Sequence, residues 1–186
     1  MRHLRRLTLM LLCAAGTILL ITARPAMTAT GGRGVDADVR AALDTLYAST
    51  PAAKHIGEHA RAILVFPRIV KAGFIIGGQY GEGALVQDGK IIGHYNSVAG
   101  SYGLQAGVQA FGYALFLMND KALAYLDQSG GWEIGVGPSI VIVDRGKAKA
   151  LTTTTLRDDV YAFIFNQKGL MAGIGIQGSK ITKVAP

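Results

Sequence analysis

Cysteine is almost absent from this chain of 186 residues, since the only one, Cys13, lies close to the N-terminus. The rest of the chain therefore offers neither a disulfide nor a thiolate zinc site. Carboxylates are also scarce, with 12 Asp and Glu against 19 Lys and Arg, for a formal net charge of +7. The basic residues form no dense stripe of the kind that binds a phosphate backbone, so we expect no nucleic acid partner.

The N-terminal segment has the pattern of an export signal. Three arginines precede an apolar run from Leu7 to Ala23, and small residues follow it. We expect residues 1–29 to be a signal peptide that is cleaved near Ala29, which places the protein in the periplasm or outside the cell. The alternative is an uncleaved inner-membrane anchor over Leu7–Ala23. Cleavage removes four basic residues and no acidic one, which lowers the net charge to +3.

After the leader we expect a flexible linker over residues 30–35 and a single domain over 36–184. Apolar residues recur at helical spacing from Asp36 to about Ala62, with Asp36 as the N-cap. Thr50 and Pro51 provide a second helix start, so this region predicts two short helices. Asn119 indicates the cap of a further, internal helix.

The chain after Ile63 has the composition of strands, rich in Val, Ile, Phe, Tyr and Thr. Short turn pairs such as Asp88-Gly89 separate the runs and predict antiparallel hairpins. No helix follows each strand, which excludes a parallel doubly wound sheet. The expected strands are Ile63–Phe66, Gly73–Gln87, Lys90–Val98, Tyr102–Met118, Trp132–Val143, Lys147–Leu156, Val160–Gln167 and Leu170–Ile181.

Glycine is abundant within these expected strands. In the stretch KAGFIIGGQYGEGALV, Gly77, Gly81 and Gly83 fall on the same alternation of the strand, and three later strands show similarly spaced glycines. Glycine in a strand marks a close backbone approach, a bulge or a sharp bend. We therefore predict a β-dominated α+β fold: a curved glycine-rich antiparallel sheet or barrel-like sandwich, with two short N-terminal helices and one internal helix.

The glycine-rich stretches do not predict a nucleotide site. The run from Gly173 to Gly178 matches G-x-G-x-x-G, but only eight residues follow it, too few for the helix that the fingerprint requires. No G-x-x-x-x-G-K-[ST] sequence is present. We expect no cofactor.

The sequence HIGEH, from His55 to His59, matches the H-x-x-E-H motif of inverted zinc peptidases. In those enzymes the two histidines hold zinc and the glutamate, here Glu58, activates water. A third ligand would be needed, for which Glu133 or Glu82 is a candidate. Gly57 weakens a helix within the motif, so we interpret HIGEH as a polar helix face and expect no metal site.

Other groups capable of catalysis lack a recognisable arrangement. Ser97, Ser101 and Ser139 are outside any G-x-S-x-G frame. Asp158 and Asp159 are interpreted as a solvated turn or cap. We therefore expect no catalytic residue.

Basic residues border two of the expected strands and form the candidate lipid site. Arg68 and Lys71 follow the first strand, while Arg145, Lys147 and Lys149 begin a later one. Lys147 and Lys149 share a face by the period of two, together with a ladder of threonines. Such a stripe fits anionic lipid headgroups. The alternative is an edge strand that lysines protect against aggregation.

Four blocks in order resemble the SYLF family of lipid-binding domains: ILVFPRIVKAGFIIGGQYGEGALV, YGLQAGVQAFGYALFLMNDKAL, GWEIGVGPSIVIVDRG and VYAFIFNQKGLMAGIGIQGSKI. The resemblance extends from Asp36 to Ile181. It implies a single glycine-rich, β-dominated domain that binds lipid. Eukaryotic members bind phosphoinositides and, in some cases, actin, whereas bacterial members are exported. The leader favours the bacterial type, so we do not extend actin binding to this chain.

We therefore expect an exported, non-enzymatic domain that binds anionic lipid or a membrane surface. Two other classes of function stay open. The first is a zinc-dependent hydrolase that uses HIGEH, and the second is a structural envelope protein that binds a protein partner.

Overall fold

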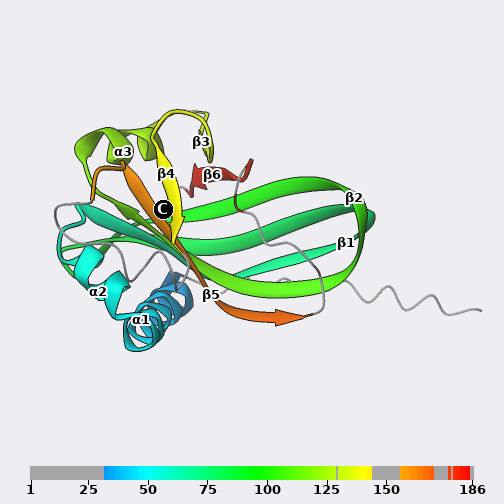
Figure 1. Ribbon diagram of the computed structural model, residues 1–186, viewed down its shortest axis with the longest axis horizontal. Coiled ribbons are helices and arrows are strands. Elements are labelled where there is room, and N and C mark those ends of the chain that lie inside the picture. The colour runs from blue at the N-terminus through cyan, green and yellow to red at the C-terminus, as the bar shows by residue number, and fades with distance from the viewer. Residues whose placement is uncertain (1–31, 129, 144–155, 170–175, 177, 185–186) are drawn as a thin grey trace, which may run out of the picture.

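The computed structural model describes residues 32–128, 130–143, 156–169, 176 and 178–184, without the side chains of 32–33 and 102–106. These residues form a β-dominated α+β fold in which two helices cover one face of a curled sheet and a third lies on the other (Figure 1). The helices are α1 (Gly32–Ser49), α2 (Pro51–Gly57) and α3 (Asp120–Ala124), and a 3-10 turn, η1 (Tyr125–Asp127), follows α3. The strands are β1 (Ala62–Gln87), β2 (Lys90–Leu117), β3 (Trp132–Glu133), β4 (Ile140–Val143), β5 (Val160–Gly169) and β6 (Lys180–Lys183). The predicted fold class is confirmed.

A long two-stranded ribbon dominates the sheet. β1 and β2 pair antiparallel from end to end, with Ala62 opposite Leu117 and Gln87 opposite Lys90. Asp88 and Gly89 connect them with φ values of 50° and 73°, as a type I′ hairpin turn requires. The predicted hairpin is confirmed.

The ribbon is more continuous than the sequence indicates. Ile63–Phe66 and Gly73–Gln87 were expected as separate strands, and so were Lys90–Val98 and Tyr102–Met118, but the structure joins each pair into one strand. Pro67 does not interrupt β1 because it lies in a bulge, where the register shifts between Phe66 and Ile69. A bulge leaves a residue out of the hydrogen-bond ladder, so the missing N–H of proline costs little there.

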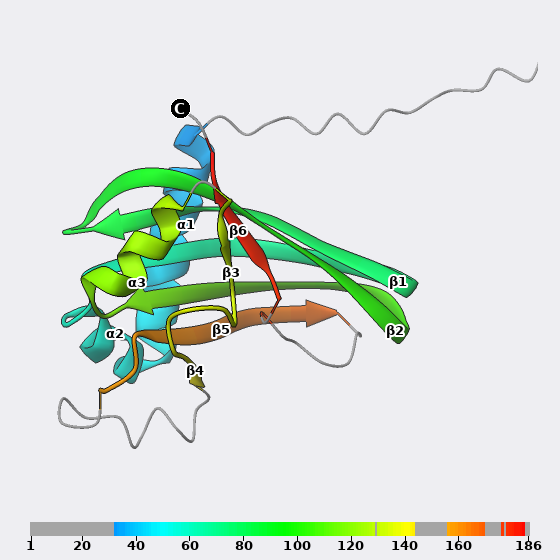
Figure 2. The same ribbon diagram turned by 90° about the horizontal axis from the view of Figure 1, so that it is seen from above.

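The ribbon folds over at the end remote from the helices (Figure 2), so that the two halves of β1 come into contact. A Cβ atom on Gly81 would stand 2.6 Å from the carbonyl oxygen of Arg68, and one on Gly83 would meet the carbonyl of Val65. Side chains cannot fit at these two positions. The expectation that alternating glycines permit a close backbone approach is therefore confirmed at Gly81 and Gly83.

The remaining strands extend the sheet on both sides of β2, in the order β3-β6-β2-β5-β4. The pairings of β2 with β1, β5 and β6 are antiparallel, as expected, but β4 and β5 are parallel. The expected strand Trp132–Val143 is also wrong, since it divides into β3 and β4. Gly135 and Gly137, with φ values of 106° and 90°, turn the chain between the two pieces.

Two hydrophobic clusters occupy the two faces of the sheet. The inner cluster includes Phe66, Tyr113 and Trp132 and is closed by α3 and η1. The outer cluster lies between the sheet and helices α1 and α2. In it, Val39 and Leu46 of α1 pack with residues from both halves of β1, so α1 covers the contact between them.

The N-terminal helices are present, but α1 begins at Gly32, within the expected linker and before the expected cap. Asp36 is therefore inside the helix, where its Oδ1 lies 2.8 Å from His94 Nε2 of β2. This contact anchors the first turns of α1 on the sheet. Thr50 is the N-cap residue of α2, as predicted, although its side chain makes no capping hydrogen bond. Asn119 caps α3, as predicted, by accepting from the backbone N–H of Ala122 over 2.9 Å.

The expected strand Lys147–Leu156 lies outside the described residues, except for its last residue. Most of the expected strand Leu170–Ile181 also lies outside the described residues. Within its range the structure describes the start of β6 at Lys180. No helix within the described ranges is both long and apolar enough to span a bilayer.

Candidate functional site

The predicted basic residues on β1 occupy two different environments. Arg68 is exposed in the bulge and lines a shallow cavity of about 130 Å³ together with Asp38 and Glu82. Lys71 lies three residues further along, half-buried, in register with Gln109 of β2. Two carboxylates therefore line the cavity beside Arg68, which reduces the positive potential there more than at Lys71.

Arg145, Lys147 and Lys149 lie outside the described residues. The basic stripe that they form with Lys71 therefore stays a prediction from the sequence.

Lys71 stands at the base of the folded end of the ribbon, which we call the sheet tip. The sheet tip consists of residues 70–78 of β1 and their partners 100–110 of β2. The end of β5 lies beside it, with Lys168 next to Ala110, which in turn faces Val70. Lys168 is exposed. As cross-strand neighbours, Lys168, Ala110 and Val70 lie on the same face of the sheet, whereas Lys71, the next residue of β1, lies on the opposite face.

The sheet tip has no negative charge of its own. Neither its two segments nor β5 contains an Asp or Glu residue. Among the described residues, Lys71 and Lys168 take part in none of the ion pairs. The two ammonium groups are therefore available to an external anion.

Three apolar residues at the sheet tip were not singled out from the sequence. Phe74, Ile75 and Ile76 are 75%, 44% and 71% exposed. The register of β1 against β2 shifts between Phe74 and Ile76, and Ile75 in this bulge has a φ of 65°. A β-branched residue in this region is strained by about 1–2 kcal/mol, so the rest of the fold must hold it there.

Two glycines explain why the ribbon bends at this point. A Cβ atom on Gly73 would meet the backbone of Gly77, and one on Gly77 would stand 2.9 Å from the Oγ atom of Ser101. The only sequence indication of the exposed tip was the break in alternation, because three consecutive apolar residues lie between these glycines.

Neutral hydrogen-bonding groups lie inside the curl behind the sheet tip. Gln79 Nε2 donates to Ser179 Oγ over 2.8 Å, and the Tyr113 hydroxyl donates to Ser97 Oγ over 2.8 Å. Burial raises the pKa of the Tyr113 phenol far above its ordinary value of 10.0. The phenol therefore stays protonated, and this cluster supplies polar contacts without a charged acid or base.

The HIGEH residues lie where α2 ends rather than along one helical face. α2 stops at Gly57, and Glu58 is its C-cap residue. His59 Nδ1 donates to the carbonyl oxygen of His55 over 2.9 Å, so this ring nitrogen is engaged with the backbone. Within the described ranges, no group of three or more His, Cys, Asp or Glu residues is arranged to hold a metal ion. A Cβ atom on Gly57 would stand 2.5 Å from the Tyr47 hydroxyl, so close packing against Tyr47 explains why this residue is glycine.

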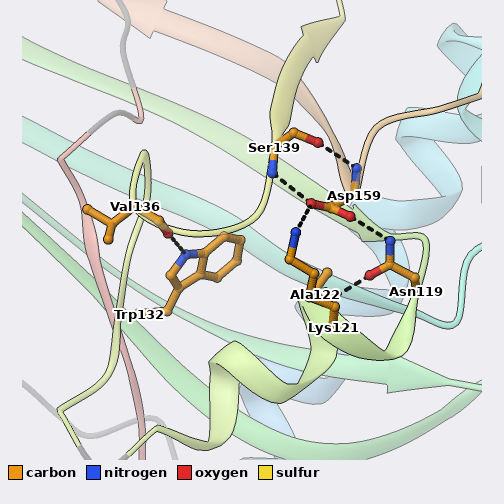
Figure 3. Close-up of polar contacts among 7 residues, drawn as sticks. All are labelled: Asn119, Lys121, Ala122, Trp132, Val136, Ser139 and Asp159. Carbon is orange, nitrogen blue, oxygen red and sulfur yellow. Dashed lines mark hydrogen bonds and ion pairs between the residues drawn. The ribbon is translucent and has the colours of Figure 1, made fainter.

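Asp159 has a structural role that the expected solvated turn only partly anticipated (Figure 3). Its carboxylate accepts from Asn119 Nδ2 over 2.7 Å, from the backbone N–H of Ser139 over 2.9 Å and from Lys121 Nζ over 2.9 Å. These hydrogen bonds hold the pKa of the Asp159 carboxyl well below its usual range, and the bond from Asn119 contributes most. Ser139 Oγ accepts from the backbone N–H of Asp159 in return. Asp159 thus connects the starts of α3, β4 and β5.

An open cavity of about 350 Å³ lies beside Ser139. Its lining comes from the segment between β3 and β4, from β4 itself and from Ile176. None of the described lining residues carries an ionisable side chain, so they supply no acid, base or charge to the cavity.

Comparison with known families gives one match. Residues 98–185 match the model of the family described as Ysc84, Las17-binding protein actin regulator. A search of curated proteins finds no match. The matched region includes most of β2 and all of the described structure that follows it, whereas α1, α2 and β1 precede it.

Proposed function

We propose, from the match of residues 98–185 to the SYLF (Ysc84) family, that the chain is a non-enzymatic domain that binds anionic lipid at a membrane surface. The family is of the lipid-binding type, and three of the four sequence blocks that carry the resemblance lie within the matched residues 98–185. The words actin regulator describe the family, and we do not include actin in the proposal.

The observation that carries the proposal is the unpaired positive charge at the sheet tip. Lys71 and Lys168 lie on opposite faces of the sheet, next to the folded end of the ribbon, without a carboxylate in the tip or in β5. Each Lys near an anionic membrane contributes about 1 kcal/mol of attraction, so these two together change the affinity by more than tenfold. Arg68, Arg145, Lys147 and Lys149 complete the proposed basic set.

The described polar groups support a non-enzymatic domain. Ser97 and Ser139 accept hydrogen bonds within the fold, and Asp159 is held by three donors. Each of these groups thus has a role in stability, and none is paired as a nucleophile with a general base, which nucleophilic catalysis requires.

We also propose that the protein acts outside the cytoplasm. The arginines and the apolar run Leu7–Ala23 support export, with cleavage near Ala29 or retention as an inner-membrane anchor. In either case the domain meets the anionic lipids of an envelope membrane.

Vesicle co-sedimentation tests the proposal. We expect the wild-type protein to pellet with vesicles of phosphatidylcholine and phosphatidylglycerol at low salt, and much less with phosphatidylcholine alone. The variant Lys71→Glu/Lys168→Glu should bind anionic vesicles at least about tenfold more weakly. The matched control is Lys54→Glu/Lys90→Glu, which makes the same charge change at exposed lysines of α2 and of the opposite ribbon end. Equal pelleting of both double variants would contradict a site at the sheet tip, and no pelleting of the wild type would contradict the function.

A further inference from the structure

The sheet tip combines its lysines with an exposed apolar surface. Phe74 and Ile76 are 75% and 71% exposed, and Ile75 lies between them at 44%. Val108 of β2, 61% exposed, and Val70, 38% exposed, continue this surface from the neighbouring positions of the ribbon. Contiguous exposed apolar residues mark surfaces that contact another apolar phase, whereas isolated ones are ordinary.

The opposite end of the same ribbon shows what a solvent-exposed turn looks like in this protein. There the chain reverses through Asp88, Gly89 and Lys90, all exposed and none of them apolar. A turn of that composition would also serve at the sheet tip if the bend were only a connection. Phe74, Ile75 and Ile76 therefore require a reason other than chain reversal.

From this contrast we propose that the sheet tip inserts Phe74, Ile75 and Ile76 into the acyl-chain region of a lipid bilayer, while Lys71 and Lys168 contact the headgroups. The inference rests on the proposed lipid-binding function and adds to it how deeply, and with which residues, the domain enters the membrane.

The spacing along β1 fits this arrangement. Lys71 precedes Phe74 by three residues, and a strand rises about 3.3 Å per residue, so the two Cα atoms are separated by roughly 10 Å along the strand. Segments that bind at the membrane interface bury their apolar residues about 5–10 Å below the headgroups. When Phe74 is buried to that depth, Lys71 stands at the headgroup level, where a long side chain keeps its charge in water.

The charges also favour a bilayer over a second copy of the chain. Two tips in contact would bring two pairs of lysines together without a carboxylate from either tip, and like charges at short distance repel. An anionic membrane offsets the lysines and receives the apolar side chains at the same time.

Fluorescent labels test the depth directly. We would introduce Ile76→Cys, and separately Ile92→Cys, into a Cys13→Ser background, so that the label has a single target whether or not the leader is cleaved. Ile92 is 50% exposed and lies near the hairpin turn at the other end of the ribbon. An environment-sensitive label at position 76 should brighten several-fold with anionic vesicles and be quenched by nitroxide groups on the acyl chains. The label at position 92 should not respond.

A pair of double variants tests how much the apolar side chains of the sheet tip contribute to vesicle binding. Transfer of one large apolar side chain out of water shifts an equilibrium by roughly tenfold or more. Phe74→Ser/Ile76→Ser should therefore bind anionic vesicles at least about tenfold more weakly than wild type, with an unchanged melting temperature because both side chains are exposed. The control Ile92→Ser/Val184→Ser changes two exposed apolar residues elsewhere, 50% and 43% exposed, and should bind as wild type does.

The outcomes separate this inference from the proposed function. If the wild type pellets at low salt but the label at 76 stays dim and the Phe74→Ser/Ile76→Ser variant binds normally, the protein only adsorbs through its charges. Insertion is then wrong while lipid binding stands. If the wild type fails to pellet with any of the vesicles, both the insertion and the proposed lipid-binding function are wrong. If the wild type is a dimer without lipid and this variant is a monomer, the tip contacts a second copy and insertion is again wrong.

Discussion

Gly81 passes so close to Arg68, an earlier residue of the same strand, that a Cβ atom on Gly81 would stand 2.6 Å from the Arg68 carbonyl oxygen. The same atom would also meet Ile69. This approach brings the two halves of β1 together under α1, so the curl of the sheet depends on a position where no side chain fits.

We predict that Gly81→Val destabilises the protein by about 1–3 kcal/mol, because the branched side chain forces the two halves of β1 apart. The control is Gly100→Val, since a Cβ atom at Gly100 has no neighbour within 4 Å. Urea unfolding of both variants measures the effect. A Gly81→Val protein as stable as the Gly100→Val protein would show that the close approach can relax without cost.

The local features of the fold were predictable, but the long-range pairing was not. The positive-φ turn at Asp88-Gly89 and the cap at Asn119 follow from chemistry within a few residues, and both are present. The parallel pairing of β4 with β5 connects Val143 to Phe163, and nothing in the alternation of either strand specifies its direction. Likewise, Pro67 marks a strand end in the sequence because a bulge cannot be distinguished from a break there.

Asp159 makes stability sensitive to acid. Hydrogen bonds from Asn119, Ser139 and Lys121 lower the pKa of its carboxyl in the folded protein. A lowered folded pKa means that the stabilisation is complete above the unfolded value of about 3.9 and is lost as the pH falls below it. We predict that Asp159→Asn costs on the order of 2 kcal/mol at pH 7 and that its stability approaches that of wild type as the pH falls below about 4.

Chemical denaturation at a series of pH values measures this convergence. Asp158→Asn serves as the neighbouring control, because among the described residues its only side-chain partner is the Tyr161 hydroxyl, 3.4 Å away. A constant difference between wild type and Asp159→Asn from neutral to acid pH would mean that the ionised carboxylate is not what stabilises the contact.

The candidate site was predictable in its charge and not in its shape. Lys71 was identified because a lysine next to an apolar strand is conspicuous in the sequence. Phe74, Ile75 and Ile76 were missed because three consecutive apolar residues look the same in a buried strand and at an exposed bend. Their exposure depends on the fold-over at Gly73 and Gly77 and on the bulge at Ile75, which only the three-dimensional arrangement shows.

We predict that HIGEH is not a working zinc site. Protein purified with chelator should keep its fold, and His59→Ala should bind anionic vesicles as wild type does, because His59 donates to the backbone of α2 and lies outside the sheet tip. Elemental analysis measures the zinc content, the melting temperature checks the fold, and co-sedimentation checks vesicle binding. Stoichiometric zinc, together with a hydrolytic activity that disappears on its removal, would instead establish the hydrolase alternative.

The last prediction concerns three lysines of the basic set, Lys71, Lys147 and Lys149, of which the structure describes Lys71. Substituting Glu for Lys71, Lys147 and Lys149 together should nearly abolish binding to anionic vesicles, since each lysine contributes about 1 kcal/mol. Attraction between exposed charges is screened over about 8 Å at physiological ionic strength, so binding by the wild type should also weaken with added salt. If Lys147 and Lys149 only protect an edge strand, glutamate serves equally well there, and the triple variant should bind no more weakly than Lys71→Glu alone. Co-sedimentation of wild type, Lys71→Glu and the triple variant at low and high salt decides between the two. A triple variant that binds like the single one would exclude Lys147 and Lys149 from the lipid site.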